Sequence, residues 1–148
     1  MEHFPEFVAN HLFLFTLLIA ILALLIWSFL GSNVGGIPQV GPAEATRLVN
    51  RENARMLDVR PLDDFNQGHI INALNLPASE TETASKKFDK YKQKPVIIYC
   101  NTGMESVRVA RTLKNEGFEN LYILKGGMQS WRNANLPVTR EESEKESA

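Results

Sequence analysis

Cys100 is the single cysteine of this chain, and its position makes it a candidate nucleophile. It follows the apolar stretch 96–99 and precedes a short polar loop that leads into a helical pattern. Main-chain N–H groups that converge at the start of a helix, together with the helix dipole, stabilise a thiolate without a neighbouring base. The alternative is an inert cysteine, because free cysteines are among the most buried residues. The loop favours the nucleophile.

The loop after Cys100 is a predicted anion-binding loop, formed by Asn101, Thr102, Gly103, Met104, Glu105 and Ser106. Successive main-chain N–H groups can bind an anion that no basic side chain of the loop neutralises. Gly103 permits close approach of the backbone, and Ser106 can cap the following helix. Turn formation alone explains both residues as well. A phosphate-binding loop needs an arginine six residues after the cysteine, and that residue is Ser106.

The composition limits the classes of function. The 148 residues include 16 Lys and Arg against 17 Asp and Glu, and 44% are hydrophobic, which fits one globular domain with an added apolar segment. Nothing in this balance points to nucleic acid. One cysteine excludes an internal disulfide and a multi-cysteine metal site, and the three histidines are scattered. We therefore expect neither a metal ion nor a cofactor.

Residues 12–30 contain no charge and predict a transmembrane helix in contact with membrane lipid. At a rise of 1.5 Å per residue this segment spans about 28 Å, close to the hydrocarbon thickness of a bilayer. A cleaved signal peptide is the alternative. However, the preceding residues include Glu2 and Glu6 and no Lys or Arg, and the apolar run exceeds a usual signal sequence. The nearest basic residues beyond the segment, Arg47 and Arg51, favour a cytoplasmic C-terminal domain.

The rest of the chain predicts an α/β domain with a mostly parallel sheet flanked by helices, because short apolar strands alternate with helical stretches. The predicted strands are 37–40, 55–59, 73–76, 95–99 and 121–124. The predicted helical segments begin at Pro42 and also cover 62–66, 82–91, 106–116 and 128–133. We expect an N-terminal segment over 1–30, a flexible linker over 31–36, the domain over 37–138 and a disordered polar tail over 139–148.

Several short motifs follow one another within residues 37–138. They are Asp58-Val59-Arg60, Gly68-His69-Ile70, Cys100-x-x-Gly103-x-x-Ser106, Gly126-Gly127 and Trp131. In order and spacing they resemble a single-domain rhodanese, a sulfurtransferase fold, and with the apolar leader they resemble its membrane-anchored bacterial form. The resemblance implies a single-pass protein of the cell inner membrane.

The resemblance also implies a mechanism. Cys100 would attack the outer sulfur of thiosulfate or a persulfide, hold it as a cysteine persulfide and pass it to a thiol acceptor. No second cysteine could divert this persulfide into an internal disulfide. The alternative is a catalytically weak rhodanese-like binding module that recruits a protein partner to the membrane.

The loop departs from the family pattern at Glu105, where the family often has arginine. A carboxylate there repels a dianionic donor and disfavours the thiolate, so thiosulfate is the less expected donor. Arg108 and Arg111 would restore positive potential if they projected toward the loop, but arginines of an amphipathic helix usually form its solvated face, which is where we expect them.

Other motif residues have predicted structural roles. The resemblance implies that Asp58 and Arg60 form an ion pair or hydrogen bonds under the loop. His69 is expected to be a packed, hydrogen-bonded histidine rather than an acid or base. Asn72 and Asn135 replace glycines of the family, and asparagine tolerates the left-handed backbone that such turns need.

Overall fold

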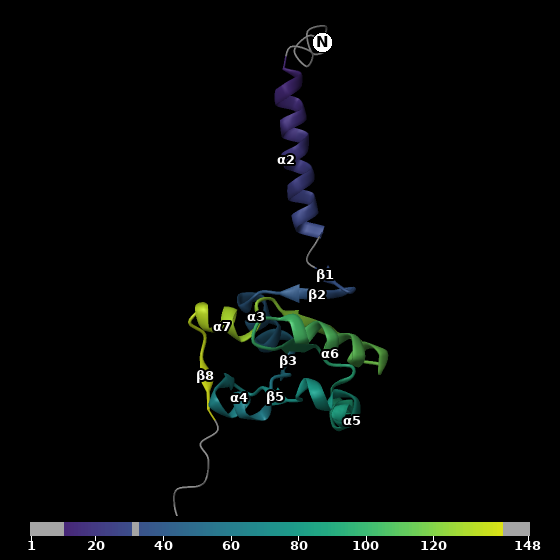
Figure 1. Ribbon diagram of the computed structural model, residues 1–148, viewed down its shortest axis with the longest axis vertical. Coiled ribbons are helices and arrows are strands. Elements are labelled where there is room, and N and C mark those ends of the chain that lie inside the picture. Colours follow the sequence, from purple (N-terminus) through teal and green to yellow (C-terminus); the bar gives the residue numbers. More distant parts are fainter. Residues whose placement is uncertain (1–10, 31–32, 141–148) are drawn as a thin grey trace, which may run out of the picture. The chain divides into compact units, whose positions relative to one another are not determined.

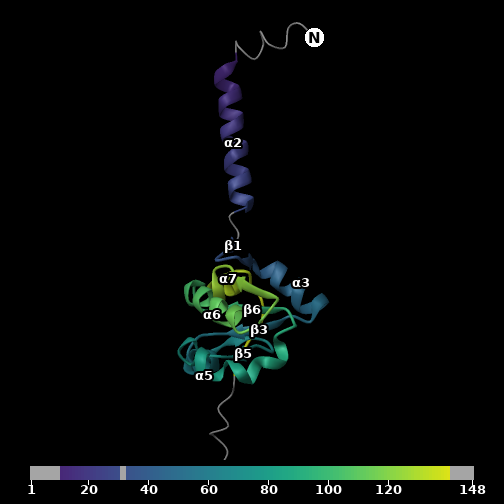
Figure 2. The same cartoon turned by 90° about the vertical axis from the view of Figure 1, so that its right-hand side faces the viewer.

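The computed structural model describes residues 11–30 and 33–140, which divide between two units, Met1–Asn33 and Val34–Ala148. In the first unit, α2 (Leu12–Leu30) is one continuous helix without a charged residue (Figure 1, Figure 2). Within the part of the chain that the structure describes, no helix is both long and apolar enough to cross a membrane. The transmembrane span therefore stays a prediction.

The second unit contains all the other helices and strands described. Strand β1 (Asn33–Val34) begins at the last residue of the first unit. The other strands are β2 (Ile37–Val40), β3 (Arg55–Asp58), β4 (His69–Ile70), β5 (Leu74–Asn75), β6 (Val96–Tyr99), β7 (Leu121–Leu124) and β8 (Val138–Thr139). Its α-helices are α3 (Pro42–Glu52), α4 (Leu62–Gln67), α5 (Thr81–Ala84), α6 (Met104–Asn115) and α7 (Gly127–Asn133). Two 3-10 helices, η1 (Ala78–Glu80) and η2 (Ser85–Tyr91), flank α5.

The main sheet has the strand order β1-β2-β7-β6-β3-β5, and β4 and β8 form a separate antiparallel pair. The pairs β2–β7, β7–β6, β6–β3 and β3–β5 are all parallel, which confirms the predicted α/β class. Parallel strands end at the same edge of a sheet, and ligands of open α/β sheets bind at that edge. Strand β6 lies in the interior of the sheet, between β7 and β3, so the residue after it, Cys100, is at the middle of this edge.

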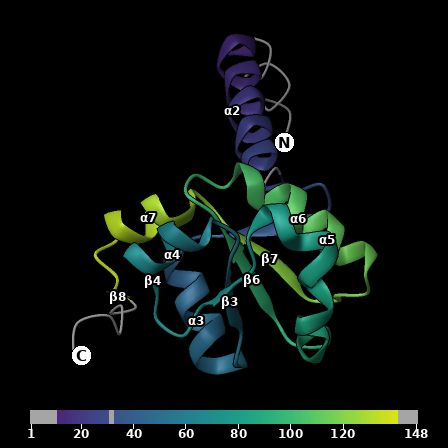
Figure 3. The ribbon, with the colours of Figure 1, turned by 60° about the horizontal axis from the view of Figure 1, so that its bottom comes forward.

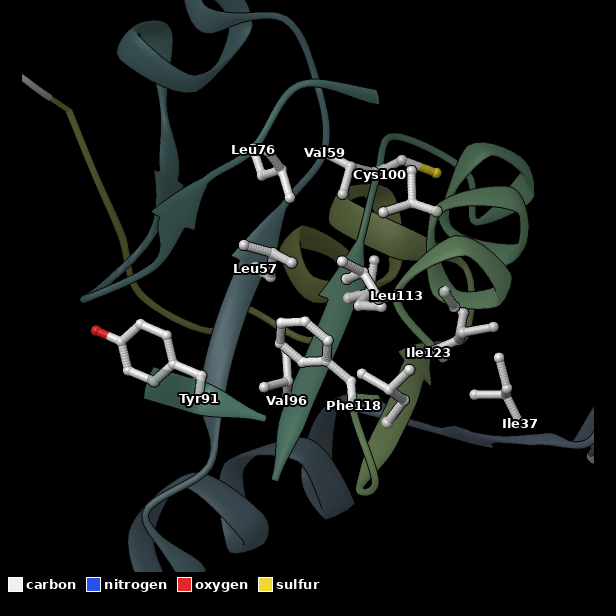
Figure 4. Close-up of a cluster of buried hydrophobic side chains, with 14 of the residues drawn as sticks. Ile37, Leu57, Val59, Leu76, Tyr91, Val96, Cys100, Leu113, Phe118 and Ile123 are labelled. Atoms are coloured by element: carbon white, nitrogen blue, oxygen red, sulfur yellow. The ribbon is translucent and has the colours of Figure 1, made fainter. Parts of the chain in front are cut away.

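Helices cover both faces of the sheet (Figure 3). Side chains of β6 alternate between the faces, because successive residues of a strand point to opposite sides. Val96 and Ile98 belong to one buried cluster, together with residues of α6, and Ile97 and Tyr99 belong to another, together with residues of α3 and α7. Cys100 continues the first set and lies at one end of that cluster, beside Val59 (Figure 4).

Most predicted elements are present, and some of them have shifted bounds. Helix α6 begins at Met104 rather than at 106, because Gly103 takes a left-handed conformation (φ 103°) and ends the loop earlier. The helix predicted over 82–91 is divided into α5 and η2, in keeping with its sparse apolar positions. Strands β1, β4 and β8 were not predicted, since two residues are too few to show an alternating pattern.

The linker and tail differ from expectation where they are described. Part of the predicted linker forms β1, and Gly35 and Gly36 form a turn into β2 with positive φ angles of 64° and 76°. Thr139, predicted to belong to the tail, pairs with His69 in the small sheet. Residues 31–32 and 141–148 lie outside the described residues, so a flexible linker and a disordered tail there stay predictions.

Candidate active site

The main chain of Cys100 is held by the start of α7. The carbonyl oxygen of Cys100 accepts a hydrogen bond of 2.8 Å from the N–H of Met128, and that of Asn101 accepts one of 3.3 Å from Gln129. These donors belong to the first turn of α7, whose N–H groups have no acceptor within the helix. The carbonyl oxygens of Cys100 and Asn101 are therefore both bound by the start of α7.

Gly127 makes this contact possible. A Cβ atom at this position would lie 2.3 Å from the carbonyl oxygen of Cys100 and 2.8 Å from that of Asn101, and the φ angle is 59°. A larger residue would push the loop away from α7 and would also strain the backbone. The sequence motif contained Gly127, but its contact with Cys100 was not predicted.

The sulfur atom of Cys100 receives one main-chain hydrogen bond, from the N–H of Gly103, with an N–S distance of 2.9 Å. Within the described residues, no other main-chain N–H group is hydrogen-bonded to this sulfur. Gly103 is the N-cap of α6, and no side chain of the described residues donates or accepts a capping hydrogen bond there. Several main-chain N–H groups were predicted to converge on the cysteine. In the described structure one such group, at the start of α6, donates to the sulfur.

The loop is divided between exposed and buried side chains. Asn101, Thr102, Met104 and Glu105 are exposed, whereas Cys100 is 3% exposed and Ser106 is fully buried. The prediction that Ser106 caps α6 is wrong, because it is the third residue of the helix and makes no capping hydrogen bond. Its hydroxyl oxygen has no hydrogen-bond partner among the described residues. The roles of the loop residues in binding sulfur stay predictions.

The end of β3 carries a buried ion pair. Nη2 of Arg60 lies 2.6 Å from Oδ2 of Asp58 and also donates to the carbonyl oxygen of Gly68 at 2.7 Å. The main-chain N–H of Arg60 donates to Oδ1 of Asp58. Burial by itself would lower the pKa of Arg60, but the hydrogen bonds and charge of Asp58 raise it overall. This confirms the implied ion pair.

Tyr99 extends this network, and its role was not predicted. It lies opposite Asp58 in the pairing of β6 with β3, and its hydroxyl accepts a hydrogen bond of 3.2 Å from the N–H of Ile70. Burial, followed by the charge of Asp58, raises the pKa of Tyr99. The side-chain amide of Asn75 donates to the carbonyl oxygens of Asp58 and Arg60, at 3.1 and 3.0 Å. The sequence did contain one indication of this role, because Tyr99 is a polar aromatic residue at the end of the strand that precedes Cys100.

His69 has the predicted structural role. Nδ1 of His69 donates to the carbonyl oxygen of Phe65 at 2.8 Å, and the rings of His69 and Phe65 stack with centroids 3.7 Å apart.

Asn72 and Asn135 adopt the left-handed backbone as predicted, with φ angles of 61° and 54°. Trp131 is buried and donates from Nε1 to the carbonyl oxygen of Pro137.

The two arginines of α6 are exposed, as predicted. Arg108 reaches the carbonyl oxygen of Ala78 at 3.4 Å, and Arg111 lies beside Gly35 in the turn between β1 and β2.

Within the described residues, no group of three or more His, Cys, Asp or Glu side chains could hold a metal ion.

Comparison with known proteins identifies the family. Residues 41–134 match the family model of the rhodanese-like domain. The chain is 35% identical over 141 residues to the uncharacterized protein YibN of Escherichia coli strain K12, which covers 95% of this chain and 99% of YibN. It is 38% identical over 94 residues to the thiosulfate sulfurtransferase GlpE of Coxiella burnetii strain RSA 331, covering 64% of this chain and 86% of GlpE.

A solved structure shares the fold. The crystal structure of a rhodanese-related protein from Thermoplasma volcanium superimposes with a TM-score of 0.63 and 27% sequence identity, covering 70% of this chain and 98% of that chain. The parallel sheet, the position of Cys100 after β6 and the buried pair of Asp58 and Arg60 agree with this assignment. The chain therefore belongs to the rhodanese-like domain family.

Proposed function

We propose that this protein is a membrane-tethered sulfurtransferase or persulfide carrier that accepts sulfane sulfur on Cys100. The observation that carries the proposal is the hydrogen bond from Gly103 to the cysteine sulfur at the start of α6. A main-chain donor and a helix N-terminus at this sulfur can stabilise negative charge that develops there during sulfur transfer. The similarity to the thiosulfate sulfurtransferase GlpE supports the same chemistry.

The first step moves one sulfur atom. The Cys100 thiolate attacks the outer sulfur of a persulfide, RS–SH, so that a bond forms between Sγ and the outer sulfur and the RS–S bond breaks. The leaving thiolate takes the proton and departs as RSH, and Cys100 carries a persulfide anion. In the second step an acceptor thiolate attacks the same outer sulfur and releases the Cys100 thiolate. No external oxidant or reductant enters either step.

The loop supplies the stabilisation that the persulfide anion needs. The outer sulfur would lie about 2 Å beyond Sγ, since that is the length of a sulfur–sulfur bond. The first N–H groups of α6 have no acceptor within the helix and can donate to an anion placed there. Since the carbonyls of Cys100 and Asn101 are bound by α7, they do not compete for this position.

The charge of the loop favours a persulfide of low charge over thiosulfate as the donor. Glu105 is exposed and forms no ion pair within the described residues, so its charge adds to the local negative potential. A thiosulfate dianion is repelled more strongly than a monoanionic persulfide by this carboxylate. We therefore propose a thiol persulfide as donor and a thiol as acceptor.

The membrane part of the proposal concerns residues 12–30, which we propose to span the inner membrane, with the catalytic domain in the cytoplasm. The support is the uncharged, apolar sequence of α2, together with the exposure of its described apolar side chains. Protease treatment of inverted membrane vesicles tests the orientation. Digestion of the domain in inverted vesicles is expected, whereas protection there would place it on the other side. Release of the protein by alkaline carbonate would contradict the span itself.

A binding module that recruits a partner is the second candidate. It is favoured by the burial of Cys100, which is 3% exposed, and by the exposure of Met104 in the same loop, which is 82% exposed. In that case the loop would present an apolar contact to another protein, and little sulfur would be transferred.

Mass spectrometry of the intact chain separates the two functions. The protein is incubated with glutathione persulfide or, separately, with thiosulfate, and Cys100→Ala is treated in the same way. The proposal expects one added sulfur atom in the parent, none in Cys100→Ala, and release of that atom by an acceptor thiol. A parent protein that gains no sulfur from either donor would favour the binding module.

A further inference from the structure

The hydroxyl of Ser106 is a buried polar group that nothing in the resting structure explains. Ser106 is fully buried, and its Oγ has no hydrogen-bond partner among the described residues. Leaving a buried hydroxyl unpaired costs stability, so such groups are rare and often serve a function. Alanine would fit the same position of α6 without this cost and with a higher helix propensity.

The position of Ser106 in α6 turns it toward the sheet. At 3.6 residues per turn, Ser106 shares a helix face with Val109, Ala110 and Leu113. These three residues are buried in the same cluster as Cys100. Cys100 belongs to that cluster because it continues the alternation of Val96 and Ile98 in β6. The unpaired hydroxyl and the cysteine side chain therefore lie on the same side of the sheet, one at each end of the loop.

Gly103 is the one main-chain donor to the sulfur of Cys100 within the described residues. A persulfide carries its negative charge on the outer atom, about 2 Å farther from the backbone of Cys100. That atom needs donors of its own, and a hydroxyl can rotate to supply one. Ser106 has a donor to give, and the described structure contains no acceptor that competes for it.

We propose that Ser106 is a specific hydrogen-bond donor to the outer sulfur of the Cys100 persulfide, and that it is left unpaired until that sulfur arrives. This inference rests on the proposed function. The unpaired hydroxyl therefore destabilises the protein without bound sulfur. This destabilisation disappears when the hydroxyl donates to the outer sulfur of the persulfide. Loading with sulfur should therefore stabilise the parent protein more than a variant that lacks the hydroxyl.

The test compares the full-length parent, Ser106→Ala and Ser106→Thr, each before and after loading with glutathione persulfide. Ser106→Ala is expected to leave the melting temperature of the unloaded protein unchanged or higher, and to gain less on loading. In the presence of a fixed concentration of an acceptor thiol, which takes the outer sulfur and releases the Cys100 thiolate, its persulfide should be lost roughly tenfold faster, the effect of removing one hydrogen bond to a charged group. Ser106→Thr keeps the hydroxyl and should restore the lifetime of the persulfide.

Thr81→Val is the matched control, because Thr81 is also buried but its hydroxyl donates to the carbonyl oxygen of Ala78 at 3.1 Å. This variant should lower the melting temperature of both forms equally. Equal persulfide lifetimes in the parent and Ser106→Ala would overturn the inference while leaving the proposed function intact. A melting temperature of unloaded Ser106→Ala as low as that of Thr81→Val would overturn it as well. A parent protein that takes up no sulfur would overturn both proposals.

Discussion

The neighbouring strands β3 and β6 end at the same edge of the sheet, and the residues at their two ends differ in how fully their polar groups are hydrogen-bonded. At the end of β3, the carboxylate of Asp58 is bound by the main chain and the guanidinium of Arg60, and Asn75 donates to nearby carbonyl oxygens. At the end of β6, among the residues that the structure describes, the sulfur of Cys100 has one main-chain donor and the hydroxyl of Ser106 has no hydrogen-bond partner. The first region has its polar groups satisfied within the protein, and the second retains hydrogen-bonding capacity.

The difference shows how a small domain can keep an unsatisfied site. Unpaired polar groups destabilise a fold, so the loop needs a rigid neighbour that fixes its backbone. Asp58 lies opposite Tyr99, the residue directly before Cys100, so the network around Asp58 holds the strand from which the loop starts. The start of α7 holds the loop from the other side.

The largest expected effect comes from breaking the satisfied region. Asp58→Asn leaves Arg60 buried without its countercharge, and we expect the free energy of unfolding to fall by about 3–5 kcal/mol. Urea denaturation measures this change. Glu44→Gln is the control, because it breaks the exposed ion pair between Glu44 and Arg47 and should have no measurable effect. Similar losses in the two variants would show that burial of the pair does not matter.

A second large effect is expected at the contact between the loop and α7. Gly127→Ala forces a Cβ atom into the carbonyl oxygens of Cys100 and Asn101 at a positive φ angle, which should lower the free energy of unfolding by about 2–4 kcal/mol. Sulfur uptake by the remaining folded protein should fall as the loop shifts. Gly41→Ala is the control, since nothing lies within 4 Å of its Cβ position. Unchanged stability in Gly127→Ala would mean that the loop is not held by this contact.

The third prediction uses pH to separate the two regions. The pKa of Tyr99 is raised by burial and by Asp58, so the folded protein retains the phenol proton where the unfolded chain, with a pKa of about 10, releases it. This contribution to stability is complete below about pH 10 and is lost as the pH rises above it, by up to about 1.4 kcal/mol per pH unit.

Denaturation of the parent and Tyr99→Phe from about pH 8 to about pH 11 measures the effect. The parent should lose stability more steeply than Tyr99→Phe above about pH 10. Tyr122→Phe, a change at a partly buried tyrosine of β7, should keep the steep loss. The same pH dependence in the parent and in Tyr99→Phe would contradict the prediction.

The smallest expected effect concerns the charge of the open region. Glu105→Arg replaces an exposed negative charge in the loop by a positive one and should raise kcat/KM for thiosulfate roughly tenfold at low ionic strength. The gain should shrink in high salt, because exposed charges are screened. Glu119→Arg makes the same change at an exposed position outside the loop and should leave the rate unchanged. An unchanged or lower rate for Glu105→Arg would mean that the local charge does not select the donor.

Much of the fold could be predicted from local patterns. Strands β2 and β7 have the predicted bounds, and β7 is an apolar run of four residues, Leu121–Leu124. The left-handed turns at Asn72 and Asn135 followed from the family resemblance, because these asparagines replace glycines of the family and asparagine tolerates that backbone. The pair of Asp58 and Arg60 followed from the family resemblance rather than from spacing alone.

The candidate site was only partly predictable. Cys100 and its loop could be identified, because a strand followed by a polar loop and a helix is a local pattern. The number of donors at the sulfur, the burial of Ser106 and the role of Tyr99 could not be predicted. Each depends on where the main chain of another element lies, to within a few tenths of an ångström.

The sequence by itself determined the α/β class, the position of the single cysteine and the absence of a basic residue in the loop that follows it. These properties depend on residue type and on short-range periodicity. Only the tertiary structure decided that Gly127 brings α7 against Cys100 and that Ser106 is buried without a hydrogen-bond partner in the described part of the chain. The reason is physical, because hydrogen bonds and close contacts between distant segments arise only after the sheet has set their distances.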